Sequence, residues 1–229
     1  MYQDPNASPF NALPKAVIVL AAAIFAVELY FMAGQAGLIG NTRGGDDLRI
    51  LAIQDYAFSG QLLDYMIRTG QFPAEHLLRF VTYPFVHFSF TSMIFAAVFV
   101  LALGKMVGEA FGNVAVCVIF FVASFVGALV YGLLLNDPRP LVGGFVGAYG
   151  LIGAYTFILW VGLGRTGQNQ MQAFTLIGAL CAYQLIFGVI FGASNDWVAE
   201  IAGFLTGGAL PMVLSPGGRA ALLAQIRRR

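Results

Sequence analysis

Apolar residues occur along this chain in long runs, and the length of the runs predicts most of the structure. A helix needs about 20 mostly apolar residues to cross the hydrocarbon core of a membrane. Six segments fit that length, and they lie at residues 15–39, 84–103, 112–135, 141–163, 172–192 and 197–214. The pattern therefore predicts an all-α membrane protein, with six transmembrane helices that form one domain over residues 1–229.

The connection between the first two predicted spans, about residues 40–83, follows a different pattern. Apolar and polar positions are mixed in it, as in an amphipathic helix that lies in the membrane interface. Asp46 and Asp47 would cap the start of one helix, and Gly70 with Pro73 would end a second. We expect a long, helical and interfacial first loop here, and a short basic tail at residues 215–229.

Composition agrees with a protein whose surface faces lipid. Of the 229 residues, 59% are hydrophobic and only 10% are charged, whereas a soluble domain carries about 25% charged residues. The net charge of +1 gives no field that would attract nucleic acid, so no such partner is expected. Cys117 and Cys181 lie within apolar runs and are expected to be small core residues. With two histidines in the chain, we expect no metal and no other cofactor.

The distribution of lysine and arginine predicts an orientation. Basic residues predominate in the flanks on the side of the termini, whereas carboxylates balance the arginines of the other side. Because short cytoplasmic flanks carry the excess of positive charge, both termini are expected in the cytoplasm. We expect an integral protein of a bacterial inner membrane. The flanking basic residues on the cytoplasmic side are Lys15, Lys105, Arg165, Arg219, Arg227, Arg228 and Arg229.

Glycines recur at four-residue spacing, which allows the backbones of membrane helices to approach closely. With 28 glycines in the chain, some of these pairs are expected by chance. The pairs and triplet are Gly143 with Gly147, Gly188 with Gly192, Gly203 with Gly207, and Gly104 with Gly108 and Gly112. We expect Gly143, Gly147, Gly203 and Gly207 to pack helices together.

One carboxylate, Glu28, falls in the middle of the first predicted span. A charged carboxylate at the centre of a bilayer costs about 2.5–3.5 kcal/mol on insertion scales. Glu28 is either protonated or directed to the interface, or else it contacts another bundle helix or a partner subunit. We favour the contact, because the short glutamate side chain must find its partner nearby.

Two segments resemble the catalytic helices of rhomboid intramembrane proteases. Residues 140–155 place Gly150, Gly153 and Ala154 as the fourth rhomboid helix does, and that helix carries the nucleophilic serine. Residues 199–207 read Ala-Glu-Ile-Ala-Gly-Phe-Leu-Thr-Gly. This stretch is similar to a motif of the sixth rhomboid helix, and the second residue of that motif is the general-base histidine. Residues 82–87 resemble the start of the second helix, which supplies oxyanion donors. The resemblance implies a six-helix rhomboid bundle.

The same resemblance places other residues at the two reactive positions. Phe145 takes the place of the serine and Val146 that of the following glycine, while slipped alignments would place Val146 or Tyr149 at the serine. No serine occurs between Ser124 and Ser194, so the loss does not depend on the alignment. Glu200 takes the place of the histidine. It is either solvated near the end of its helix or turned into the bundle and hydrogen-bonded there.

The second helix also departs from the family. Counting from His87, the second histidine of the family becomes Ser92 and its asparagine becomes Ala96. His87 remains, but in the family this first histidine is not catalytic, and we expect it to be a hydrogen-bonded structural group. These replacements predict a rhomboid fold without serine-protease chemistry.

What the resemblance leaves is a bundle that can hold another membrane helix. It implies a lateral opening beside the fifth span and an apolar groove, formed by Phe145, Val146, Tyr149, Glu200 and His87. We expect a rhomboid pseudoprotease that binds transmembrane segments of client proteins, besides lipid, as adaptor, chaperone or quality-control factor. The alternatives are a structural subunit of a larger membrane complex and, by family resemblance alone, an intramembrane serine endopeptidase.

Overall fold

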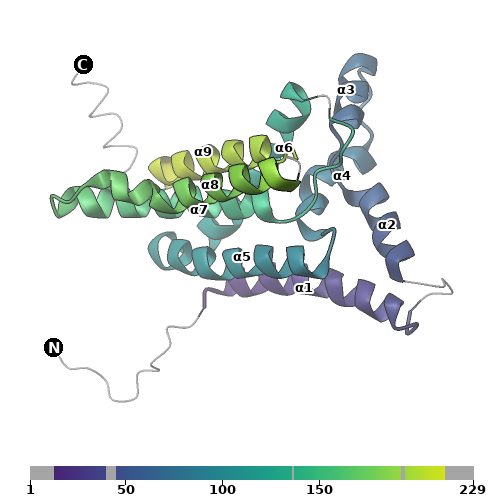
Figure 1. The fold of residues 1–229 in the computed structure, drawn as a ribbon, viewed down its shortest axis with the longest axis horizontal. Coiled ribbons are helices and arrows are strands. Elements are labelled where there is room, and N and C mark those ends of the chain that lie inside the picture. Colours follow the sequence, from purple (N-terminus) through teal and green to yellow (C-terminus); the bar gives the residue numbers. More distant parts are fainter. Residues whose placement is uncertain (1–12, 40–44, 136, 192–193, 215–229) are drawn as a thin grey trace.

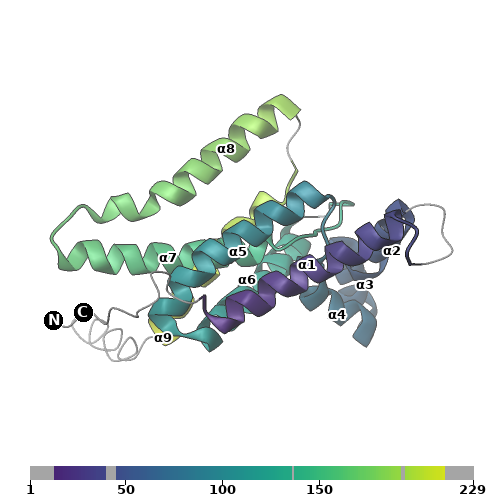
Figure 2. The same ribbon diagram turned by 90° about the horizontal axis from the view of Figure 1, so that it is seen from below.

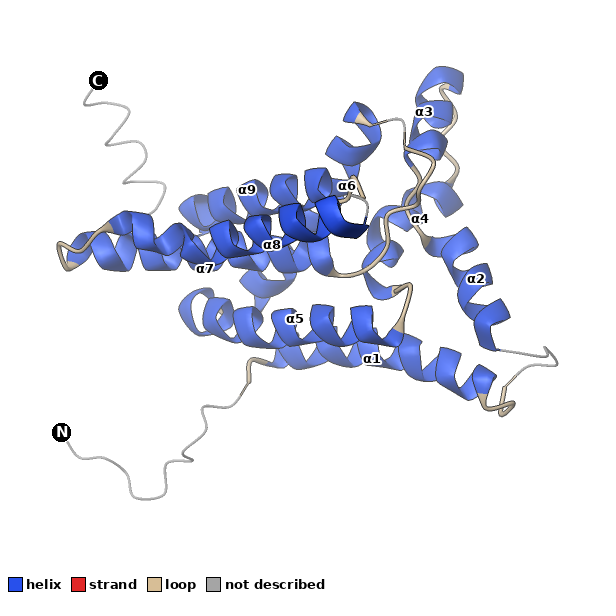
Figure 3. Cartoon of the chain, viewed as in Figure 1, coloured by secondary structure: helices blue, strands red, loops and turns tan. Residues whose placement is uncertain are grey.

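The computed structural model describes residues 13–39, 45–135, 137–191 and 194–214. Within these ranges the regular elements are helices joined by loops, and there is no strand (Figure 3). Among the described residues, four helices are long and apolar enough to cross a membrane, and α9 has a shorter apolar stretch. The expectation of an all-α membrane bundle is confirmed. The long helices are α1 (Lys15–Gln35), α5 (Phe90–Phe111), α6 (Asn113–Leu134), α7 (Phe145–Arg165), α8 (Thr175–Phe191) and α9 (Trp197–Leu214).

The long first loop is helical, as its amphipathic pattern predicts. It contains α2 (Gly45–Tyr56), α3 (Gly60–Thr69), α4 (Ala74–Thr82) and the 3-10 turn η1 (Tyr83–Phe85). These elements gather at one end of the bundle, opposite the end where α1 begins and α9 ends (Figure 1). Gly70 ends α3 in the left-handed conformation, with φ at 67°, whereas Pro73 precedes α4 and so begins the next helix. Asp46 and Asp47 lie inside α2 rather than before it.

The second span begins later and ends later than the predicted 84–103. Pro84 lies within η1 rather than in the long helix. Ser89 then caps α5, because its side chain accepts a hydrogen bond from the backbone N–H of Ser92. The helix continues until Gly112, whose φ of 86° is readily available only to glycine. Gly112 therefore separates α5 from α6 instead of packing helices together.

The fourth span begins at Phe145, not at the predicted residue 141. Leu141 instead exchanges two backbone hydrogen bonds with Phe58 of the first loop, at 2.8 and 3.1 Å. Gly143 follows with φ at 92°, so the chain turns there before the helix starts. Gly143 was expected as a helix-packing partner of Gly147, and this expectation is wrong, because Gly143 lies outside the helix.

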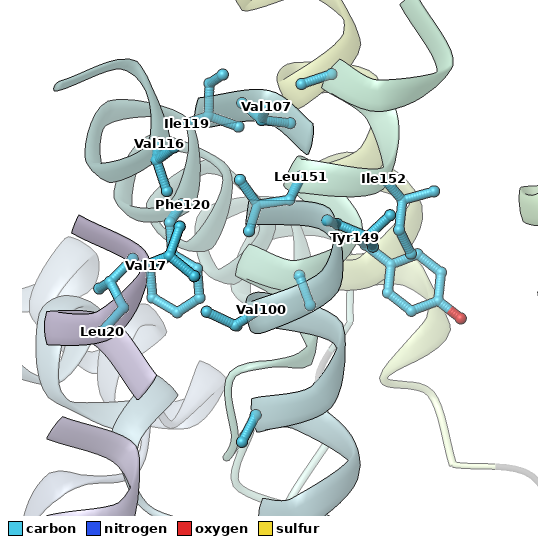
Figure 4. Packing of buried hydrophobic residues seen from close by; sticks show 14 of the residues in the cluster. Val17, Leu20, Val100, Val107, Val116, Ile119, Phe120, Tyr149, Leu151 and Ile152 are labelled. Atoms are coloured by element: carbon cyan, nitrogen blue, oxygen red, sulfur yellow. The ribbon is translucent and has the colours of Figure 1, made fainter. Parts of the chain in front are cut away.

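The core lies between α1, α5, α6 and α7 (Figure 4). A second cluster joins the first loop to α6, with Phe58, Leu63 and Phe80 packed near Tyr131. Both cysteines are free thiols and half-buried, and Cys181 packs against the main core. The labelled residues of the main core are Val17, Leu20, Val100, Val107, Val116, Ile119, Phe120, Tyr149, Leu151 and Ile152.

Helix α8 differs from the other long helices in its orientation. It follows the turn η2 (Gln170–Phe174) and then runs at an angle away from the other helices (Figure 2). Residues of its first turns, including Leu176, Ile177 and Cys181, pack against the core, whereas Tyr183 and Ile186 are exposed. Among the described side chains of α8, those in its first turns thus contact the core. The structure does not describe the surroundings of Gly188, and Gly192 lies outside the described residues, so this expected glycine pair stays a prediction.

Candidate functional site

The positions of the expected dyad lie at the seam between α7 and α9. Val146, in the first turn of α7, is only 2% exposed. A Cβ atom at Gly203 of α9 would lie 2.6 Å from the carbonyl oxygen of Val146, so the two backbones are nearly in contact. On the other side, Gly127 of α6 leaves space for the Val146 side chain. Val146 is thus enclosed by three helices.

The same seam continues deeper through a series of glycines. A Cβ atom at Gly207 would overlap the backbone of Gly150, and one at Gly153 would overlap the carbonyl oxygen of Phe204. Gly147 faces α6 instead, where Phe120 and Ser124 fill the space beside it. The four-residue spacing of Gly203 and Gly207 therefore corresponds to a close backbone contact of α9 with α7.

Glu200 is turned into the bundle. It is 7% exposed and lies in the first turn of α9, where a carboxylate interacts favourably with the helix dipole. The Tyr149 side chain of α7, itself in a buried residue, lies close to the Glu200 carboxylate. Of the two possibilities for Glu200, the structure supports the side chain that is turned into the bundle rather than a solvated one. The only hydroxyl among the three alternative nucleophile positions, that of Tyr149, is the one that contacts it.

His87 holds the start of α7 in place. It lies between η1 and α5 and is 1% exposed. Its Nε2 atom accepts a hydrogen bond from the backbone N–H of Gly144 at 3.2 Å, and Gly143 donates to the Tyr83 carbonyl at 2.9 Å. Burial lowers the pKa of His87 to about 4, so the imidazole is neutral at pH 7 and can accept this bond. His87 is a structural hydrogen-bonding group, as expected.

The second-helix positions offer little to a developing oxyanion. Ser92 is half-buried in the first turn of α5, and Ala96, one turn further, is fully buried and has no polar side-chain atom. Four of the five residues expected to line a groove, namely Val146, Tyr149, Glu200 and His87, are buried in helix contacts. Phe145 alone among them is partly exposed. These four side chains are therefore packed in this structure, and the apolar groove stays a prediction.

The loops that lead into α7 and α9 are joined beside this seam. Asn195 donates a hydrogen bond of 2.6 Å to the carboxylate of Asp137. The backbone N–H of Arg139 also donates to Asp137, and this bond together with that from Asn195 lowers the pKa of Asp137. Asp196 is more enclosed, and burial raises its pKa. The two loops thus share a polar network that fixes the helix starts relative to each other.

Glu28 finds its partner in the first loop. Its carboxylate forms two hydrogen bonds with Arg49 of α2, at 2.5 and 3.0 Å. Arg49 also donates to the carbonyl oxygen of His87 at 2.8 Å and lies over the ring of Phe31. The expected contact of Glu28 is thus present, although with α2 of the first loop rather than with another spanning helix. Sequence reasoning missed Arg49, since an arginine in an amphipathic loop normally faces water.

Comparison with known proteins identifies the fold. The family model of the Rhomboid domain matches residues 74–217. This chain belongs to the rhomboid family. It is also 26% identical over 137 residues to Rhomboid-like protease 3 of Toxoplasma gondii, an alignment that covers 58% of this chain and 50% of that protein. The chain therefore spans about half the length of that relative.

Membership of this family shows which chemistry to look for at the contact between α7 and α9. In this rhomboid-family protein the α7–α9 contact, where the family's dyad is expected, contains Val146, Tyr149 and Glu200 packed between glycines. A serine hydrolase needs a nucleophile activated by an adjacent base and donors for the oxyanion. From residue 125 to residue 193 the chain contains no serine that could act as that nucleophile.

Proposed function

We propose that this rhomboid-family membrane protein is a pseudoprotease that binds transmembrane segments of other proteins, as adaptor, chaperone or quality-control factor. One observation carries the proposal: the place of the dyad is occupied by a closely packed Val146 and by a Tyr149–Glu200 pair. A site filled in this way excludes a scissile peptide bond. The fold itself argues for no particular chemistry.

The surface that would receive a client helix lies beside the seam. Helix α8 contacts the bundle through its first turns, and the exposed residues further along it include Tyr183 and Ile186. Phe145, half-buried at the start of α7, is the predicted groove residue that remains accessible. We infer that a client segment would lie against α5 and α8 near Phe145. Such contacts between membrane helices rely on shape and close packing.

Photo-crosslinking from a single position tests this proposal. In one variant, benzoylphenylalanine replaces Phe145 at the start of α7. In the control it replaces Leu133, an exposed residue near the end of α6. Both variants are reconstituted in liposomes with several unrelated single-span segments. We expect crosslinks from position 145 to several segments and severalfold fewer from position 133. Equal crosslinking yields at the two positions would show that Phe145 does not lie at a client-binding surface. Crosslinking to a single partner at fixed stoichiometry would show that the protein is a structural subunit of a complex.

The Tyr149–Glu200 contact is the one observation that favours a hydrolase. A hydroxyl beside a carboxylate is a nucleophile–base arrangement. Tyr149 is only 4% exposed, however, so a substrate would not reach it in this structure. We expect no covalent labelling by a fluorophosphonate probe. Labelling that disappears in Tyr149→Phe would establish an unconventional hydrolase and overturn the pseudoprotease proposal.

A further inference from the structure

A cavity of about 490 Å³ lies between α1, α2 and η1, among residues separate from those of the α7–α9 seam. Its volume falls within the range of about 300–1,000 Å³ found for small-molecule sites. No charged residue lines it. Alanines on two helices leave the space open, and aromatic rings form much of the wall. The lining includes Ala26 and Phe31 of α1, Ala52 and Tyr56 of α2, Thr82 of α4 and Phe85 of η1.

Hydrocarbon is the filling that suits these walls. The cavity is open to its surroundings, since Tyr30 and Tyr56 in its lining are about half exposed, and its apolar walls lack dispersion contacts wherever no protein atom fills the space. Water would find few polar partners in it, because the lining is almost entirely apolar. Since α1 is long and apolar enough to cross a membrane, the cavity beside it is accessible to the acyl chains of lipids.

Polar atoms without a partner lie on α4, one and two turns before Thr82, which lines the cavity. Thr82 donates a hydrogen bond to the carbonyl oxygen of Tyr56, and both residues line the cavity. One turn earlier on α4, Arg79 donates from Nη1 to the next carbonyl, that of Ala57, at 3.1 Å. The Nε atom of Arg79 is buried and has no hydrogen-bond partner. One turn earlier still, the Nδ1 atom of His76 is also buried without a partner.

Arg79 also lacks a counter-ion. Within the described part of the chain, the ion pairs involve Arg49, Arg68 and His76, and none involves Arg79. Helix α4 exposes the apolar residues Leu77, Leu78 and Val81. A helix of this kind lies at the boundary between acyl chains and headgroups. The anion present at that depth is the lipid phosphate, which arginine binds through a bidentate geometry.

We propose that this cavity binds one phospholipid, with an acyl chain between α1, α2 and η1 and with its phosphate on Arg79. The acyl chain explains the size and apolar lining of the cavity. The phosphate supplies the acceptor that the buried Nε atom of Arg79 lacks. The site is separate from the surface proposed for client helices.

Native mass spectrometry of the full chain in mild detergent tests the site. The probes are dioleoylphosphatidylglycerol and dioleoylglycerol, which has the same chains but no phosphate. Ala26→Leu and, from the opposite wall, Ala52→Leu fill the cavity, and Ala110→Leu on the exposed side of α5 is the matched control. Arg79→Gln removes the charge, and Arg68→Gln, which alters an exposed ion pair, is its control.

We expect one tightly retained phosphatidylglycerol in the unmodified protein and in both controls. Retention falls in Ala26→Leu and Ala52→Leu for both probes. In Arg79→Gln it falls about tenfold for phosphatidylglycerol, as expected for a lost hydrogen bond between charged groups, and stays unchanged for dioleoylglycerol. Equal retention in the cavity variants and Ala110→Leu would show only non-specific surrounding lipid. An equal loss of both probes in Arg79→Gln would show that Arg79 does not bind the phosphate.

Discussion

Buried charges in this protein occur where two separate parts of the chain meet. Glu28 belongs to α1, which is long enough to span a membrane, and Arg49 belongs to α2 of the first loop. Their side chains are 3% and 11% exposed. Arg49 reaches further to the carbonyl oxygen of His87, and the His87 ring holds the backbone N–H of Gly144. A line of hydrogen bonds therefore runs from α1 through α2 to the first turn of α7. Each residue on it has a partner that substitution would leave unpaired.

Glu28→Gln is expected to destabilise the protein strongly. The change leaves the Arg49 cation buried without its counter-ion, and breaking a buried pair in this way costs about 3–5 kcal/mol. The control is Asp64→Asn, which breaks the exposed Arg68–Asp64 pair and should cost about 0–1 kcal/mol. Unfolding free energies in mixed detergent measure both. Equal losses in the two variants would mean that the buried pair contributes no more than a surface pair.

His87 is expected to make stability depend on pH between about 4 and 6.5. Its pKa is about 4 in the folded protein and 6.5 in the unfolded chain, so the unfolded state binds more protons in this window. Stability therefore rises with pH across the window, by about 1.4 kcal/mol per unit from this group, and the contribution is constant above it.

Comparison with His87→Gln isolates that contribution, because a glutamine oxygen can still accept the bond from Gly144. The difference in unfolding free energy between the two proteins is measured from pH 4 to pH 8. We expect the slope below pH 6.5 to be smaller in His87→Gln, and His76→Gln serves as the control. Parallel curves would show that His87 is protonated equally in both states.

At the scale of elements, the order and type of the helices could be predicted from the sequence, but several of their ends could not. Runs of apolar residues predict the spans, because lipid requires long apolar helices. The ends depend on single residues whose effect is tertiary or conformational. Leu141 is apolar and continues a run, yet it pairs with the backbone of Phe58, 83 residues earlier. Gly112 extends the apolar run but adopts a φ that ends a helix.

The site shows the same limit. The resemblance brought Phe145, Val146 and Glu200 to one region, and the structure places all three at the loop-facing starts of α7 and α9. It could not show that Val146 fills the seam or that Tyr149 contacts Glu200. Nor did any pattern pair Glu28 with Arg49, because contacts between distant segments carry no periodic signal.

Adjacent glycines on α9 provide a sharp test of the α7–α9 contact. A Cβ atom at Gly207 would overlap the backbone of Gly150, whereas one at Gly208 would lie 3.5 Å from the nearest atom, in ordinary contact. Gly207→Ala should therefore cost about 1–3 kcal/mol through overpacking. Gly208→Ala should be neutral or stabilising, because alanine favours a helix by about 1 kcal/mol over glycine. Thermal unfolding in detergent compares them. Similar midpoints would mean that α7 and α9 are not in backbone contact.

At the scale of the whole molecule, the polar contacts at the starts of α7 and α9 lie at one end of the bundle. The close glycine contacts between α7 and α9 extend from there toward the other end. The helices of the first loop, the start of α7 and the start of α9 all lie at that end, opposite the start of α1 (Figure 1). We propose that this end faces away from the cytoplasm, since the basic flanks lie at the other end.

Cysteine labelling in intact bacterial cells that express the chain tests this orientation. Asp64→Cys on α3 and Gln168→Cys before η2 are each made after Cys117 and Cys181 are replaced by alanine. Both residues are in polar connections at opposite ends of the bundle. We expect a membrane-impermeant maleimide to label position 64 in intact cells and position 168 only after lysis. The reverse pattern would place both termini outside.

The Glu28–Arg49 pair also constrains how the protein is made. Arg49 follows Glu28 by 21 residues, so at about 5–20 residues per second it is synthesised about 1–4 s later. The Glu28 carboxyl is therefore without its partner Arg49 for that interval, whether the first helix is still in the translocation channel or already in lipid. During this interval the Glu28 carboxyl is stable in lipid only if it is neutral or still in contact with the channel. Completion of the first loop, rather than insertion of α1, is then the step that commits this helix to its final position.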